Sequence, residues 1–152
     1  MTPHEFRPLP AWDAVSAPFW EAADRGELAL QRCRRCARFQ HPPRPVCHHC
    51  RSYELGWDRV NPSVVIESWT TVRQQTHPAF PVPYVIAVAS VDDARPIRMV
   101  ANLLGCEPED VTIGMRARVV FERLADGTAL PQFSLDLTKS DETAGNQGRI
   151  RL

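Results

Sequence analysis

The sequence predicts a mainly β protein with an N-terminal helix, a four-cysteine zinc ribbon and a five-stranded OB-fold barrel. Two observations carry this prediction: two Cys-x-x-Cys pairs lie ten residues apart, and five candidate strands follow them. We therefore expect an N-terminal arm and helix at 1–26, a zinc ribbon at 27–60, an OB fold at 61–137 and a flexible tail at 138–152.

An extended arm and one helix are expected before the cysteines. Residues 1–14 are rich in proline and show no hydrophobic period. The helix that follows can be capped by Ser16, carry Pro18 in its first turn and end at Gly26 in a left-handed conformation. Its apolar positions fall at helical spacing on one face: Val15, Phe19, Ala22 and Ala23.

The cysteine spacing predicts a structural metal site. Two residues between the cysteines of a pair let a tight turn aim both sulfurs at one point, and two such turns give the tetrahedral geometry that zinc prefers. Four thiolates leave no coordination position for water, so a structural role is expected rather than a catalytic one. The predicted ligands of one Zn²⁺ per chain are Cys33, Cys36, Cys47 and Cys50.

Several alternatives around this site stay open. Iron can occupy a similar four-thiolate site. His48 or His49, inside the second pair, could replace a cysteine ligand, although such residues more often point outward. A redox dithiol fits less well, because two pairs are present. Cys106 stands apart in the sequence, so we expect a small buried side chain there rather than a reactive thiol.

The remaining chain reads as strands. Short strands are expected at 28–31 and 55–60, on either side of the cysteine pairs, whereas the three prolines between the pairs exclude a helix or a central strand. A helical turn at 107–111 separates the third and fourth barrel strands, as in an OB fold; an all-β sandwich would usually need two more strands. The candidate barrel strands are 64–75, 84–91, 97–104, 116–124 and 130–137.

Charge is balanced overall but not locally. The formal net charge is zero, so no global field favours nucleic acid or an anionic membrane. Between residues 32 and 59, however, seven arginines face only Glu54 and Asp58. Part of this excess compensates the net negative charge of a four-thiolate zinc site; the rest suits an anionic partner, such as coenzyme phosphates, a nucleic-acid backbone or an acidic protein surface. The arginines predicted to contact CoA phosphates or a partner are Arg34, Arg35, Arg38 and Arg44.

Other patterns narrow the functional class. No apolar run approaches the about 20 residues needed to cross a bilayer, and the N-terminus lacks signal-peptide features, so we expect a cytoplasmic protein without a membrane partner. Reduced thiols there favour metal binding over disulfides. No phosphate loop, nucleophile elbow or His-Glu-x-x-His helix occurs, so no catalytic residue is predicted.

Aromatic side chains outside the expected strands can either pack within this chain or contact another protein. Phe80, in the proline-rich loop 77–83, could fill a partner's pocket or pack within its own loop. Trp12, Phe19 and Trp20 could cover the zinc module or dock on another subunit.

Motifs along most of the chain resemble those of a known family. They are Pro18-Phe19-Trp20-Glu21-Ala22, Leu30-Gln31-Arg32-Cys33-Arg34-Arg35-Cys36, Pro42-Pro43-Arg44-Pro45-Val46-Cys47-His48-His49-Cys50, Pro83-Tyr84-Val85-Ile86-Ala87, Asn102-Leu103-Leu104-Gly105-Cys106, Ile113-Gly114-Met115 and Val119-Val120-Phe121. Together they are similar to the rubredoxin-like zinc-ribbon plus OB-fold proteins long catalogued as a domain of unknown function. The resemblance runs from about residue 18 to residue 133.

This resemblance implies a role beside another enzyme. Such proteins accompany thiolase-superfamily enzymes, including acetoacetyl-CoA-handling enzymes, acyltransferases and lipid-transfer-protein-like aldolases that shorten steroid side chains. The resemblance implies that the zinc-ribbon protein stabilises the assembly and helps form the acyl-CoA path, while the partner supplies the catalytic residues. Acyl-CoA is thus expected as a shared ligand. Some relatives carry a fused hotdog-fold hydratase domain, which has no counterpart in these residues.

Two other functions are compatible with parts of the sequence. A nucleic-acid-binding module is possible because zinc ribbons and OB folds both serve that role, but the expected strands offer few basic residues beside exposed aromatics. A stand-alone acyltransferase or hydrolase would need a nucleophile and a base at a spacing that the sequence does not offer.

Overall fold

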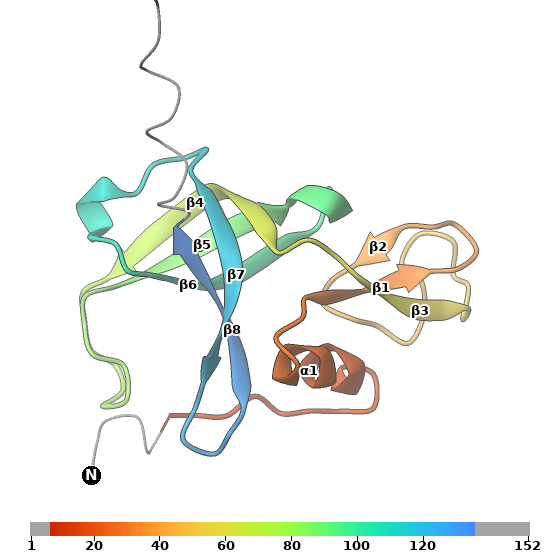
Figure 1. Cartoon of the computed structure of the whole chain (residues 1–152), viewed down its shortest axis with the longest axis horizontal. Coiled ribbons are helices and arrows are strands. Elements are labelled where there is room, and N and C mark those ends of the chain that lie inside the picture. Colours follow the sequence, from red (N-terminus) through yellow and green to blue (C-terminus); the bar gives the residue numbers. More distant parts are fainter. Residues whose placement is uncertain (1–6, 136–152) are drawn as a thin grey trace, which may run out of the picture.

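The computed structural model describes residues 7–135. A closed five-stranded barrel lies beside a small three-stranded sheet, and helix α1 lies between them (Figure 1). The predicted mainly β fold, with one N-terminal helix, a four-cysteine cluster and an OB-fold barrel, is confirmed. No helix within residues 7–135 is long and apolar enough to cross a membrane.

Helix α1 (Ala17–Asp24) begins differently from the prediction. Ser16 occupies the N-cap position, but its side chain caps no helix amide; its hydroxyl donates instead to the carboxylate of Asp13 at 2.6 Å. A nearby carboxylate competes for the hydroxyl that would otherwise face the helix. The predicted end is confirmed, because Gly26 has a φ of +73° and its N–H donates to the carbonyl of Ala23 at 2.9 Å.

The helix connects the two sheets. It contacts both the three-stranded sheet and barrel strand β8 (Ala129–Leu135), burying Phe19, Ala22 and Ala23. The predicted apolar face therefore lies inward, as helical spacing requires. At the C-terminal end of the helix, Arg123 of the barrel donates to the Asp24 carboxylate at 3.0 Å.

The small sheet follows the expected pattern around the cysteines. Its order is β2-β1-β3, with β1 at Ala29–Cys33, β2 at Phe39–Gln40 and β3 at Leu55–Arg59. Both neighbours run antiparallel to β1. The sequence did not indicate β2, which is an edge strand of only two residues because prolines begin one residue beyond it, at Pro42.

The barrel contains five strands in the order β4-β5-β6-β8-β7, and β7 pairs back onto β4. All neighbours are antiparallel except β6 and β8. Short 3₁₀ turns, η2 (Asp92–Ala94) and η3 (Pro108–Asp110), connect strands, the second at the predicted helical turn. The remaining strand bounds are β4 Ser63–Val72, β5 Tyr84–Val91, β6 Arg98–Leu104 and β7 Arg116–Arg123.

These strands lie close to their predicted positions. Strand β4 ends at Val72 rather than at residue 75, because the polar residues that follow Val72 are exposed. Residues 136–137 of the last predicted strand, the predicted tail at 138–152 and residues 1–6 of the arm lie outside the described residues. The domain boundaries after residues 26 and 60 remain predictions.

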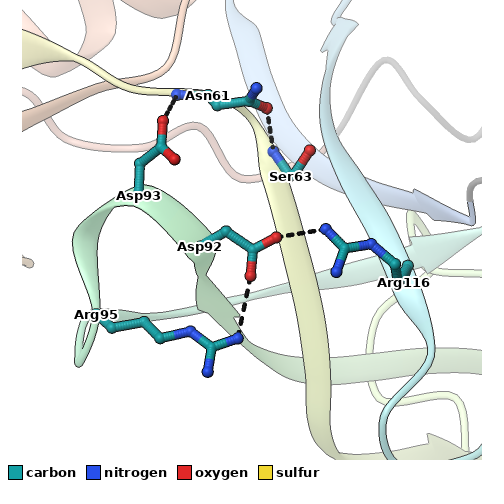
Figure 2. Close-up of polar contacts among 6 residues, drawn as sticks. All are labelled: Asn61, Ser63, Asp92, Asp93, Arg95 and Arg116. Carbon is teal, nitrogen blue, oxygen red and sulfur yellow. Dashed lines mark hydrogen bonds and ion pairs between the residues drawn. The ribbon is translucent and has the colours of Figure 1, made fainter.

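A polar cluster secures the crossing from the ribbon to the barrel (Figure 2). In the linker, the amide of Asn61 donates to the Asp93 carboxylate at 3.0 Å, and the Asn61 side chain accepts from the amide of Ser63 at 3.0 Å. Beside it, Asp92 accepts from Arg95 at 3.1 Å. The adjacent carboxylates Asp92 and Asp93 begin η2.

The barrel core is apolar and follows strand alternation. Along β5, Val85, Ala87, Ala89 and Val91 are buried, and Phe133 of β8 is fully buried. This core contains no metal ligand, and it continues into helix α1 and the ribbon through Phe19, Leu28 and Leu30, so hydrophobic burial stabilises the barrel.

Replacing Phe133 by alanine should lower the free energy of unfolding by about 3–5 kcal/mol, because it leaves a cavity in a closed core. Urea unfolding followed by circular dichroism measures the change. Ile113→Ala is the control, since Ile113 is 70% exposed and should change stability by less than about 0.5 kcal/mol. Equal losses in both variants would contradict this description of the core.

Candidate metal centre

Two nearly identical turns carry the cysteine pairs. In each turn, the amide four positions after the first cysteine donates to that cysteine's carbonyl at 3.0 Å, from Ala37 to Cys33 and from Arg51 to Cys47. Ala37 and Arg51 both have left-handed backbones, with φ of 60° and 59°. This repetition presents the two pairs to each other with matching geometry, as the spacing predicts.

The four sulfur atoms converge. All lie within 4.8 Å of one another, with Cys33 and Cys50 at 3.5 Å and Cys36 and Cys47 at 3.6 Å. A tetrahedral site with Zn–S bonds of about 2.3 Å requires sulfurs about 3.8 Å apart. The donor set and its geometry therefore fit zinc, and four sulfurs complete its coordination.

Burial differs between the two positions of each pair. Cys33 and Cys47 are each 1% exposed and lie inside the ribbon, whereas Cys36 and Cys50 are half-buried. The N–H of Cys36 also points to the sulfur of Cys33, at 3.5 Å. Amide donors of this kind stabilise thiolates, so the ribbon supports the charged form that a metal requires.

The pKa values of the thiols show why a cation is needed. A hydrogen bond from the Cys50 amide lowers the pKa of Cys47 to about 6, and one from the Cys36 amide lowers that of Cys33. The Ser52 amide lowers the pKa of Cys50 as well, but desolvation and the three neighbouring cysteine side chains raise it to about 12. Four thiolates cannot coexist at neutral pH unless a cation offsets their repulsion.

A buried pair of glutamines, which sequence reasoning missed, supports the second turn. Gln40 donates through its amide nitrogen to the side-chain oxygen of Gln31, which also accepts from the amide of Arg44 at 2.9 Å. The Gln40 oxygen accepts from the amide of His48 at 3.1 Å and lies 3.1 Å from its Nδ1. Both glutamines are almost fully buried. Only the fold brings these polar residues together, so local patterns gave no signal of them.

The histidines do not lie among the sulfurs. His48 and His49 are both exposed, and the cluster contains only the four cysteines. Cys106 lies apart from that cluster and packs against the barrel core, but it is half-buried rather than buried as predicted. Desolvation and the negative charges of Asp110 and Glu107 raise the pKa of its thiol.

The four arginines predicted to contact an anion differ in their surroundings. Arg34 binds Asp58 at 2.7 Å, donates to the Trp57 carbonyl at 3.1 Å and lies over Gly56, where any side chain would collide with it. Arg34 is therefore used within the ribbon. Arg35, Arg38 and Arg44 are exposed. Their contact with CoA phosphates or a partner remains a prediction.

Most of these aromatic side chains pack within the chain, and Trp12 stays partly exposed. Phe19 is buried, and its ring lies 5.5 Å from that of His41, so it covers the zinc ribbon. Trp20 packs edge-on against Phe19, and Trp12 stacks on Trp20 but stays 45% exposed. Phe80 packs within the described chain, with the guanidinium of Arg7 over its ring at 5.3 Å.

Comparison with known proteins agrees with this architecture. Residues 20–56 match the family model of the ChsH2 rubredoxin-like zinc ribbon domain, and residues 57–122 match that of the ChsH2 C-terminal OB-fold domain. A chain in the solved structure of the Ltp2-ChsH2(DUF35) aldolase superposes with a TM-score of 0.77 at 31% identity, covering 84% of this chain and 98% of that one. The chain belongs to the ChsH2 (DUF35) family.

Two curated relatives show the range of this family. A probable enoyl-CoA hydratase alpha subunit of Thermomonospora curvata is 37% identical to this ChsH2-family chain over 115 residues, 74% of this chain and 35% of that protein. A DUF35 domain-containing scaffold protein of Methanocaldococcus jannaschii is 29% identical over 98 residues, 62% of this chain and 67% of that one. The chain thus spans about a third of the length of the first relative, 35%. The resemblance found in the sequence motifs is confirmed.

Cys47→Ser should remove most of the bound metal. The wild-type chain, purified without chelator, should contain one equivalent of zinc per chain by mass spectrometry of its metal content, since four thiolates form the site. Cys106→Ser is the matched control and should keep the full equivalent, because Cys106 is outside the cluster. Substoichiometric zinc in the wild type, or full zinc in Cys47→Ser, would contradict the assignment.

Zinc binding at pH 7.5 should release protons. Zinc binds thiolates, so Cys50, whose pKa is raised to about 12, must give up its proton to bind the metal. Zinc affinity should therefore fall as pH decreases, since protons compete for the thiolates. Titration calorimetry in buffers of different ionisation enthalpy measures the released protons. An enthalpy independent of buffer would rule this out.

Proposed function

We propose that this chain is a non-catalytic accessory subunit. It binds and stabilises a thiolase-superfamily enzyme, of the thiolase, acyltransferase or lipid-transfer-protein-like aldolase type, and helps form that enzyme's acyl-CoA site. The observation that carries the proposal is the match to the Ltp2-ChsH2(DUF35) aldolase, where 98% of the matched chain is covered at 31% identity. That protein is named as a two-component aldolase, and the other relatives are named as a subunit and a scaffold.

The chemistry of the metal site and of Cys106 favours a non-catalytic role for this chain. Four cysteines fill the coordination sphere of a zinc ion, so its metal would have no position for a substrate or water. Cys106 is poorly suited to attack a thioester, because its raised pKa keeps the thiol protonated at neutral pH. The reacting groups are therefore proposed to come from the partner.

An apolar groove offers a surface for that partner. Strands β6 and β8 pair only at Leu103 and Leu104, and a groove opens beyond this point. Pro131 of β8 lines this groove, where β8 no longer pairs with β6. Val100 is 66% exposed at the groove, which continues to Trp20 of the N-terminal helix. Exposed apolar side chains gathered in this way are typical of protein interfaces.

Support for the acyl-CoA part is chemical. The Thermomonospora relative is named for an enoyl-CoA reaction. Arg35, Arg38 and Arg44 are exposed on the ribbon, and guanidinium groups bind phosphates in bidentate fashion.

Co-expression with a thiolase-superfamily enzyme from the same genome tests the proposal. The two chains should co-purify through gel filtration, and the enzyme's acyl-CoA turnover and thermal stability should fall when the chain is omitted. If they never co-purify and the enzyme is fully active alone, the proposal fails. Binding of nucleic acid at physiological salt instead would favour the alternative function.

Val100→Asp should weaken this complex by on the order of tenfold or more, because an unpaired carboxylate would be buried at the interface. Ile113→Asp is the matched control, since Ile113 is 70% exposed and does not line the groove. Surface plasmon resonance on the zinc-loaded chain gives both affinities. Equal affinities for wild type and Val100→Asp would place the partner on another surface.

A further inference from the structure

A second cavity lies where the zinc ribbon meets the barrel. It measures about 390 Å³ and is lined by ribbon residues including Arg38, Phe39 and His48 and by Arg95 and Ile97 of the connection between β5 and β6. Cavities of about 300–1,000 Å³ are typical of small-molecule sites. The cavity exists only because the two sheets are held side by side (Figure 1).

Its charged lining is cationic. No salt bridge within residues 7–135 involves Arg38 or His48. Arg95 donates to Asp92, but Asp92 also accepts from Arg116 at 2.5 Å, as Figure 2 shows. Asp92 and Asp93 balance Arg95 and Arg116 in that cluster, but neither carboxylate lines the cavity. Two arginines, one from the ribbon and one from the connection between β5 and β6, therefore line the cavity without a carboxylate among the lining residues.

The other walls are apolar or fixed in position. Ile97 is 8% exposed, and the half-buried ring of Phe39 is covered by Arg32, whose guanidinium carbon lies 5.0 Å from the ring centre. The Gln40 amide nitrogen faces the carbonyls of Arg44 and Val46, so its oxygen faces His48 and holds that ring in place. Cationic groups beside a flat apolar wall suit a ligand that joins a phosphate to an aromatic ring.

We propose that this cavity binds a phosphorylated nucleoside, with Arg38 and Arg95 on the phosphates and the base against Phe39 and Ile97. The inference rests on the proposed function, within which the ligand is the adenosine 3′,5′-bisphosphate end of acyl-CoA. It selects Arg38 from the four arginines that sequence reasoning singled out and adds Arg95, which no sequence pattern connected to them. The ribbon and the barrel each supply one guanidinium group.

Calorimetric titration of the full, zinc-loaded chain with adenosine 3′,5′-bisphosphate tests the site. Binding should be at least about tenfold tighter than that of inorganic phosphate, which shares the anion but not the base. Arg38→Gln and Arg95→Gln should each weaken binding about tenfold, since each removes a charge-assisted contact. Arg118→Gln, at an exposed position of β7, removes the same charge elsewhere and should change affinity less than about twofold.

Lack of saturable binding, equal losses in all three variants, or phosphate binding as tightly as the bisphosphate would each overturn the inference. None of these results would prevent co-purification with the enzyme, so failure of this site is distinguishable from failure of the proposed function.

Discussion

The convergence of four cysteine sulfurs is the constraint on which the ribbon depends. The segment 27–60 has few large apolar side chains, and units below about 40 residues rarely fold without a metal or disulfides. Zinc binding to comparable sites contributes about 10–16 kcal/mol, which exceeds what this small core could supply. The cation also offsets the desolvation and the neighbouring cysteine side chains that raise the pKa of Cys50 to about 12. Metal and ribbon therefore form one folding unit, whereas the barrel strands contribute most of an apolar core that continues into the ribbon through Leu28 and Leu30.

The surfaces proposed to bind other molecules follow from how this ribbon is held against the barrel. Helix α1 packs between the two sheets through Phe19, and the linker is fixed by Asn61 and Asp93. With the ribbon in place, an apolar groove forms on one side, and a cationic cavity forms where Arg38 approaches Arg95. A structural zinc ion could thus act on function without touching a substrate, by fixing the positions of these residues.

Local chemistry made much of the fold predictable. The cysteine spacing indicated the metal cluster, and runs of β-branched residues indicated the five barrel strands, because both signals are contained in short stretches of sequence. The prediction that the Ser16 side chain caps the helix was wrong. Serine is a common N-cap residue, but here its hydroxyl donates to the Asp13 carboxylate instead. The Gln31–Gln40 pair and the approach of Arg38 to Arg95 could not be predicted, since they depend on how separate elements pack.

Hydrogen–deuterium exchange of the zinc-loaded chain, before and after removal of the metal by a chelator, tests the central claim most directly. The account predicts that amides of β1 and β3 lose their protection when zinc is removed, while those of β5 and β7 keep theirs, because the barrel core needs no metal. Unchanged protection in the ribbon after complete zinc removal would contradict it.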